Sequence, residues 1–189
     1  MLRPARPSDS PHLARLIILA MGDLADKFVN LSSDKVPLFE HFARLENNQY
    51  SYENMLVWDD NGVQGMINCY NGADLQALRA AFVEYIASEF NVFVQPEDET
   101  QPGEYYIDCL AVYPEHQGKG IGKKLIAGLA SYANTKHYNK LGLLVKTSNT
   151  AAIRLYTGLN FKVVDDRIFM GDIYHHLQLD TDEFGQVSK

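Results

Sequence analysis

The stretch "LAVYPEHQGKGIGKKLI", Leu110 to Ile126, constrains this chain more than any other because it places three glycines at alternate positions. Gly118, Gly120 and Gly122 stand where an apolar, strand-like run ends and a helix-like run begins. Glycine is the poorest ordinary helix former, so its repetition at a helix start needs a reason. The stretch is either a plain turn or a place where bare backbone closely approaches a ligand.

A ligand with phosphate groups would explain the glycines. The first amides of a helix have no intrahelical partner and carry partial positive charge, so they attract anions. Glycine lets phosphate oxygens approach these amides because it has no Cβ. Lys119 and Lys124 add positive charge to the stretch. The amides expected to converge on one pyrophosphate are those of Gly118, Gly120, Ile121, Gly122 and Lys123.

The spacing of the glycines discriminates between phosphate-binding motifs. A Walker loop ends in Gly-Lys-Ser/Thr, whereas this stretch ends in Gly-Lys-Lys and lacks the hydroxyl that binds magnesium. A dinucleotide fingerprint needs Gly-x-Gly-x-x-Gly, whereas the spacing here is Gly-x-Gly-x-Gly. The pattern that fits is Gln-x-x-Gly-x-Gly, formed by Gln117, Gly120 and Gly122 after a strand. A glycine-rich turn without a ligand remains the alternative.

A second segment, "LLVKTSNTAAIRLYTGLNF", has an equally distinctive order of residues. A strand is followed by Asn149, then by a helix that ends in Tyr156, then by Gly158 and Phe161. Together with the glycine stretch, this order resembles the GCN5-related N-acetyltransferases (GNAT family), in which the glycine motif binds acetyl-coenzyme A (acetyl-CoA). The resemblance covers residues 105 to about 164, roughly a third of the chain.

The resemblance implies how the cosubstrate is held. The strand residues Leu110 to Val112 would offer main-chain groups to the pantetheine arm, and their strand would part from the strand 141–146 to open a slot for the thioester. Asn149 would hold the pantetheine chain, although an N-cap of the next helix is an alternative role. The cofactor-binding residues implied in this way are Leu110, Ala111, Val112, Gln117, Gly118, Lys119, Gly120, Ile121, Gly122, Lys123, Asn149 and Tyr156.

The resemblance also implies the catalytic groups. Tyr156 would be the general acid that gives a proton to the departing thiolate, or else a packed aromatic side chain. Members of the family carry a glutamate at one of two strand positions, which here are Leu144 and Tyr106. Asp108 shares a strand face with Tyr106 and is the best candidate for the general base, with a structural carboxylate as the alternative. Weaker candidates are Glu104, Glu115 and His116.

Hydrophobic periodicity and turn residues predict an α/β chain with a twisted mixed sheet and helices on both faces. The resemblance implies that this sheet belongs to the GNAT-like acyl-CoA N-acyltransferase fold, with which the order of elements is compatible. We expect one domain over residues 1–189, with a helical insertion at about 73–100. The predicted helices are 10–20 capped by Ser8 or Asp9, 24–30, 36–47, 73–90, 118–136 and 149–159. The predicted strands are 1–5, a hairpin around the turn 60–62, 105–112, 141–146, "NFKVV" and "RIFMGDIYHHLQL".

Composition excludes several classes of protein. The formal net charge of -7 argues against a nucleic-acid surface. Apolar runs are too short to cross a bilayer, and no signal peptide is recognisable, so we expect a cytoplasmic protein that does not bind membranes. Cys69 and Cys109 are expected to be buried, reduced thiols. The histidines, including the adjacent pair His175 and His176 on opposite strand faces, lack ligand spacing and predict no metal site.

The acceptor pocket is expected between residues 22–50, the helix 73–90 and the last strands. Seven acidic side chains in this half would suit a cationic amine, although a solvated acidic surface explains them more simply: Asp23, Asp26, Asp34, Glu40, Glu46, Asp74 and Glu84. The helix 73–90 would form a lid or a homodimer contact. The chain is thus predicted to transfer an acetyl group from acetyl-CoA to a primary amine of a small molecule or peptide, by direct attack in a ternary complex. Alternatives are a non-catalytic acyl-CoA sensor and a nucleotide-phosphate binder.

Overall fold

A computed structural model describes residues 1–30 and 34–183 of the chain. The strands are β1 (Leu2–Pro4), β2 (Met55–Asp59), β3 (Val63–Asn71), β4 (Tyr105–Val112), β5 (Lys140–Lys146), β6 (Lys162–Phe169) and β7 (Asp172–Asp180). The helices are α1 (Ser10–Met21), α2 (Val36–Arg44), α3 (Leu75–Phe90), α4 (Ile121–Thr135) and α5 (Thr150–Thr157). Short 3₁₀ segments join them, of which η2 (Gly22–Phe28) extends α1.

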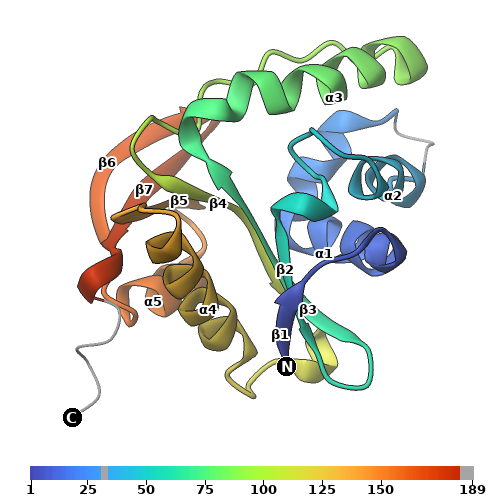
Figure 1. Ribbon diagram of the computed structural model, residues 1–189. Helices are drawn as coiled ribbons and strands as arrows, with labels where there is room; N and C mark the ends of the chain where they lie inside the picture. The colour runs from blue at the N-terminus through green and yellow to red at the C-terminus, as the bar shows by residue number, and fades with distance from the viewer. Residues whose placement is uncertain (31–33, 184–189) are drawn as a thin grey trace.

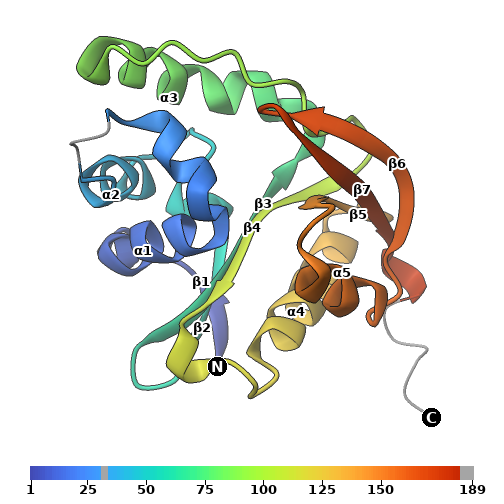
Figure 2. The ribbon, with the colours of Figure 1, turned by 180° about the vertical axis from the view of Figure 1, so that it is seen from behind.

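The strands form one sheet in the order β1-β2-β3-β4-β5-β7-β6. Within the described residues, β4 and β5 pair in parallel and the other neighbours pair antiparallel. Helices α1 and α2 cover one face, and α4 and α5 cover the other (Figures 1 and 2). Each face has its own apolar core, because side chains alternate along the central strands. The predicted mixed sheet with helices on both faces is confirmed.

The helix α1 shows how the predicted apolar faces meet the sheet. Leu13, Leu16 and Ile17 are fully buried, as their spacing requires for one face of a helix. The predicted side-chain cap by Asp9 is wrong for this helix. Its carboxylate instead accepts a hydrogen bond from the backbone N–H of Arg6 at 2.8 Å and forms an ion pair with the guanidinium of Arg3 at 2.7 Å. Asp9 therefore ties the first strand to the turn that precedes α1.

Several predicted boundaries are wrong by a few residues. Helix α4 begins at Ile121 rather than Gly118, because Gly118 and Gly120 both have a φ of 74° and cannot continue a right-handed helix. Helix α2 ends at Arg44, and the helix expected over 24–30 is the 3₁₀ segment η2. Strand β6 runs without a break from "NFKVV" to Phe169, and the turn falls at Met170-Gly171. Residues 31–33 of the predicted acceptor region lie outside the described residues.

The predicted insertion at 73–100 consists of α3 and an extended segment that runs back along it (Figures 1 and 2). Arg79 lies on the buried face of α3, and its guanidinium donates to the carbonyl oxygens of Pro96 at 3.3 Å and Glu97 at 3.2 Å. The Thr100 hydroxyl donates to the Gly72 carbonyl. These bonds fasten residues 96–100 beneath α3, close to the centre of the sheet.

Glu104 lies between this segment and the start of β4, and it is fully buried against β5 and β7. Its carboxylate lies 2.9 Å from His176 Nε2 and accepts a hydrogen bond from Gln178 Nε2 at 2.8 Å. A Cβ added at Gly142 would lie 2.1 Å from Glu104 Oε2, so only glycine leaves room for the carboxylate on β5. Glu104 is therefore a structural carboxylate that joins the two halves of the sheet.

We predict that Gly142→Ala destabilises the fold by about 2–4 kcal/mol, because the displaced carboxylate leaves buried donors without an acceptor. Urea denaturation measures the change. Gly122→Ala is the matched control, since nothing lies within 4 Å of a Cβ there. Equal midpoints for the two variants would contradict the packing argument.

Candidate active site

Strands β4 and β5 part near the middle of the sheet. Their pairing stops after Ile107 and Leu143, so the second half of β4 lacks a partner on this side. On the other side, the register against β3 shifts between Asn68 and Cys69, which leaves Asp108 as an extra residue. Such a bulge bends the strand and redirects its side chains. The parting that the family resemblance implied is present, and Asp108 lies at its start.

A groove of about 490 Å³ begins beyond this point and follows the glycine stretch. Nine of the predicted cofactor-binding residues line it, which is all of those in β4, the loop and the start of α4 except Lys119. Lys119 instead donates to the carbonyl oxygen of Glu115 at 3.1 Å. The groove residues are Leu110, Ala111, Val112, Gln117, Gly118, Gly120, Ile121, Gly122 and Lys123, together with His116 and Leu155.

The glycines keep the floor of the groove open. Gly120 is the N-cap residue of α4, and nothing lies within 4 Å of a Cβ built at Gly118, Gly120 or Gly122. The first helical hydrogen bond runs from Lys124 N to Gly120 O, and among the described residues the amides of Gly118 to Lys123 have no hydrogen-bond acceptor, which leaves them free for an anion. Gln117 closes the loop by donating to the Val112 carbonyl at 3.0 Å. These observations fit a pyrophosphate seated on the start of a fifteen-residue helix.

A second cavity of about 410 Å³ meets the groove at Leu110. Its walls come from α1 and η2, α3, β4, β5, α5 and the β6–β7 hairpin. Phe28, Tyr50 and Phe82 provide aromatic surface from the N-terminal side, and Phe169 and Tyr174 provide it from the hairpin. The lining of this cavity includes parts of the three regions from which the sequence predicted an acceptor pocket, namely residues 22–50, the helix 73–90 and the last strands.

The acidic residues that suggested a cationic acceptor are not in this cavity. None of the seven lines it, and six of them are exposed. The alternative interpretation, a solvated acidic surface, is therefore the correct one for them. Two other carboxylates line the cavity instead, Asp108 on β4 and Glu99 on the segment beneath α3.

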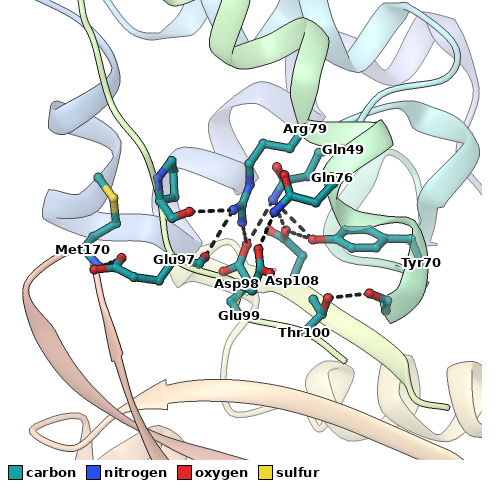
Figure 3. A network of polar contacts seen from close by, with 12 residues as sticks. Gln49, Tyr70, Gln76, Arg79, Glu97, Asp98, Glu99, Thr100, Asp108 and Met170 are labelled. Carbon is teal, nitrogen blue, oxygen red and sulfur yellow. Dashed lines mark hydrogen bonds and ion pairs between the residues drawn. The ribbon is translucent and has the colours of Figure 1, made fainter. Parts of the chain in front are cut away.

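Asp108 is held by three neighbouring side chains. Its Oδ2 accepts hydrogen bonds from Gln49 Nε2 at 2.6 Å and from the Tyr70 hydroxyl at 2.7 Å, and its Oδ1 lies 3.0 Å from Cys109 Sγ. Gln49 lies between Asp108 and Glu99, because its Nε2 also approaches Glu99 Oε1 at 3.4 Å (Figure 3). The two carboxylates therefore belong to one network.

Glu99 is the functional candidate that sequence analysis missed. It is 8% exposed and forms a buried ion pair with Arg79. Burial raises the pKa of the Glu99 carboxyl, and the negative charge of Asp108 raises it further, against the opposing effect of Arg79. A signal for Arg79 existed, because this charged residue occupies the apolar row of α3 with Leu75 and Phe82. The acidic run that contains Glu99 offered no comparable signal.

The remaining predicted residues fall into two groups. Tyr156 lines the cavity, and its hydroxyl makes no hydrogen bond within residues 1–30 and 34–183. Burial raises the pKa of Tyr156, which keeps the phenol protonated. Asn149 also lines the cavity, and it caps α5 by accepting a hydrogen bond from Ala152 N at 3.1 Å. Its side-chain NH₂ is unbonded among the described residues, so both proposed roles are compatible.

Other candidates lie away from the reacting centre or carry no charge. Tyr106 and Leu144, which stand where relatives carry glutamate, do line the cavity. Glu104 is structural, and Glu115 is exposed on the loop. His116 lines the groove rather than the cavity. Within the described part of the chain, no cluster of three metal-ligating side chains occurs, and no helix is long and apolar enough to span a membrane.

Comparison with known proteins agrees with this geometry. Residues 23–161 match the model of the "Acetyltransferase (GNAT) family". One solved acetyltransferase is 26% identical with a TM-score of 0.80, covering 96% of this chain and 99% of its own. An N-acetyltransferase from Staphylococcus aureus is 24% identical with a TM-score of 0.79, covering 95% of this chain and all of its own.

Curated relatives match over shorter stretches. An N-alpha-acetyltransferase, RimI, from Mycobacterium tuberculosis is 37% identical over 65 residues, 34% of this chain and 39% of its own. A spermine/spermidine N(1)-acetyltransferase from Bacillus subtilis is 26% identical over 84 residues, 44% of this chain and 55% of its own. The matched segments thus span between a quarter and about half of such relatives. Since the family model covers most of the sequence and the fold agrees, the chain belongs to the GNAT family of acetyltransferases.

Proposed function

We propose that this protein transfers the acetyl group of acetyl-CoA to a primary amine of a small molecule or peptide, by direct attack in a ternary complex. The observation that carries the proposal is the meeting of two cavities at Leu110, where β4 leaves β5. One cavity has free amides for a pyrophosphate, and the other has carboxylates for an amine. The thioester carbon would lie where they meet.

The chain's own groups account for binding of the cosubstrate. The amides at the start of α4 would hold the pyrophosphate, and the unpaired backbone of Leu110 to Val112 would bond to the pantetheine arm as a further strand would. Asn149 would orient that arm through its free NH₂. Acetyl-CoA supplies an activated thioester when it is bound. The residues present fit acetyl-CoA, because Gly118, Gly120 and Gly122 leave open space beside the free amides at the start of α4.

Two groups would assist the acyl transfer. A backbone amide of Leu110 or its neighbours would donate to the carbonyl oxygen as negative charge develops there. Tyr156 would give its phenol proton to the departing sulfur, since its hydroxyl is free and its pKa is raised. Cys109, whose thiol pKa is also raised by burial, is not expected to act as a nucleophile.

A positively charged amine fits the second cavity better than an anionic acceptor. Asp108 and Glu99 carry two negative charges when ionised, and Arg79 compensates for one of them. Arg79 is already bonded to Glu99 and to two carbonyl oxygens, so it is not available for a substrate carboxylate. The names of two relatives, an N-alpha-acetyltransferase and a spermine/spermidine N(1)-acetyltransferase, also support an amine as the acceptor. One acetyltransferase domain, a cytoplasmic location and a homodimer contact through α3 remain predictions.

A non-catalytic acyl-CoA sensor is the alternative function. Release of free thiol from acetyl-CoA in the presence of spermidine, lysine, an aminoglycoside or an N-terminal peptide distinguishes the two. Amine-dependent release supports the transferase. Binding of acetyl-CoA in calorimetry without release from any amine supports the sensor.

We predict that Gly120→Glu lowers the affinity for acetyl-CoA by about 100-fold or more, because a carboxylate would replace the open space at the pyrophosphate site. Isothermal titration calorimetry measures the change. Gly120→Asn is the control, since asparagine tolerates a φ of 74° without adding charge and should bind more tightly than the glutamate variant. Unchanged affinity in Gly120→Glu would place the pyrophosphate elsewhere.

We predict that Tyr156→Phe lowers kcat by about 10²-fold or more with little change in KM for acetyl-CoA. The ring should still pack against Phe161, whose centroid is 5.5 Å away, so the melting temperature should not change. Steady-state kinetics and thermal unfolding test both parts. A variant with the kcat of the wild type would show that another group protonates the sulfur.

A further inference from the structure

We propose that Glu99, rather than Asp108, takes the proton from the ammonium group of the acceptor, and that Asp108, Arg79 and Gln49 position it. This inference rests on the proposed acetyl transfer. Glu99 belongs to the segment beneath α3, outside the stretch that carries the family motifs. The insertion would therefore supply the base for which neither Tyr106 nor Leu144 has a carboxylate.

The hydrogen bonds of the two carboxylates differ. Both oxygens of Asp108 have partners, namely Cys109, Gln49 and Tyr70. Only Oε1 of Glu99 is engaged, by Arg79 and more weakly by Gln49. Glu99 Oε2 has no hydrogen bond within the described part of the chain, and the residue lines the acceptor cavity (Figure 3). Glu99 thus has one carboxylate oxygen without a hydrogen-bond donor, whereas both oxygens of Asp108 already accept hydrogen bonds.

The surrounding charges favour a Glu99 that accepts a proton. Burial and the nearby Asp108 raise the pKa of Glu99 above its ordinary value, while Arg79 and Gln49 oppose the shift. A general base is most effective when its pKa lies near the working pH. The titratable and charged groups around Glu99 are Arg79 on α3, Tyr50 before β2, Tyr70 on β3, Tyr106, Asp108 and Cys109 on β4, Arg167 on β6 and Tyr174 on β7.

The segment holds Glu99 in place from both sides. Arg79 bonds to the carbonyl oxygens on its N-terminal side, and Thr100 bonds to Gly72 immediately after it. Glu97 accepts a hydrogen bond from Met170 N at 2.8 Å, which ties the segment to the β6–β7 turn. A group fixed in this way does not need to reorganise during the reaction.

The proton balance of the step is simple. Glu99 accepts one proton from the ammonium, directly or through one water, and the neutral nitrogen forms its bond to the acetyl carbon. The carbon–sulfur bond then breaks, and its electron pair leaves with sulfur, which takes the proton of Tyr156. The second proton lost by the nitrogen restores the phenol, and Glu99 releases its proton to solvent. No oxidant, reductant or further reactant is needed.

Glu99→Gln tests the proposal, with Asp98→Asn as the matched control. Asp98 precedes Glu99 on the same segment, but it is exposed and does not line the cavity. With an amine that the wild type acetylates, we expect Glu99→Gln to lower kcat/KM at neutral pH by about 10²-fold or more. The difference in kcat/KM between this variant and the wild type should shrink as the pH approaches the ammonium pKa of about 10, because the amine then binds in its neutral form. The control should match the wild type throughout.

A second readout does not depend on activity. Carbon-13 NMR of the side-chain carboxyls of the free protein should show one group that titrates above the ordinary glutamate pKa of about 4.3. This signal should be absent in Glu99→Gln and should move to lower pH in Asp108→Asn, which removes the neighbouring charge. Glu99→Asp keeps a carboxylate that can pair with Arg79, so it should retain the pH dependence of the wild type at a reduced rate. This variant replaces Glu99→Gln in the test if the glutamine variant does not fold.

Two results would overturn the proposal while leaving acetyl transfer intact. One is a Glu99→Gln variant with the pH profile and kcat/KM of Asp98→Asn. The other is a variant that raises only KM for the amine with an unchanged profile, which would make Glu99 a binding group. Failure of the proposed function has a different signature, because the wild type would then release no thiol with any amine.

Discussion

The separation of β4 from β5 is the constraint on which the rest of the site depends. Parallel pairing over three residue pairs holds the two halves of the sheet together, and beyond Ile107 it stops. Backbone groups left without a strand partner must find another partner, because unpaired buried amides are costly. In this protein, the second half of β4 lines both the groove and the second cavity, and the bulged Asp108 lies at the point where the strands part.

The second structural theme is the placement of charge inside the sheet. Glu104, directly before β4, reaches across β5 to His176 on β7, whereas Glu99, Arg79 and Asp108 line the cavity. Buried charges are expensive unless they are paired and hydrogen-bonded. The Glu104 carboxylate is fully satisfied, which suits a structural role. The Glu99–Asp108 network retains an excess negative charge and a free oxygen, which is the arrangement that functional sites use to shift pKa values.

The sequence predicted correctly those features that depend on residues close to one another along the chain. The spacing of Gln117, Gly120 and Gly122 predicted a helix start with open backbone, because positive φ angles and free amides are local properties. Asp108 and Tyr106, which the sequence predicts on one strand face, do both line the cavity, although a bulge at Asp108 interrupts the regular alternation of β4. For the acidic residues of the N-terminal half, the simpler interpretation of a solvated surface is the one that the structure supports, since none of the seven lines the cavity.

The sequence by itself determined the family, the mixed sheet, the glycine-rich helix start that lines the groove and the choice of Tyr156 as the candidate acid, since each of these follows from a short motif or a periodic pattern. Only the tertiary structure decided which carboxylates line the second cavity. The sequence gives no reason to prefer one of the three consecutive acidic residues Glu97, Asp98 and Glu99 as a functional group. The irregular segment that carries them packs against Arg79, and this packing places the carboxylate of Glu99 beside the guanidinium. Burial and charge pairing arise between residues distant in the chain, and no local pattern specifies them.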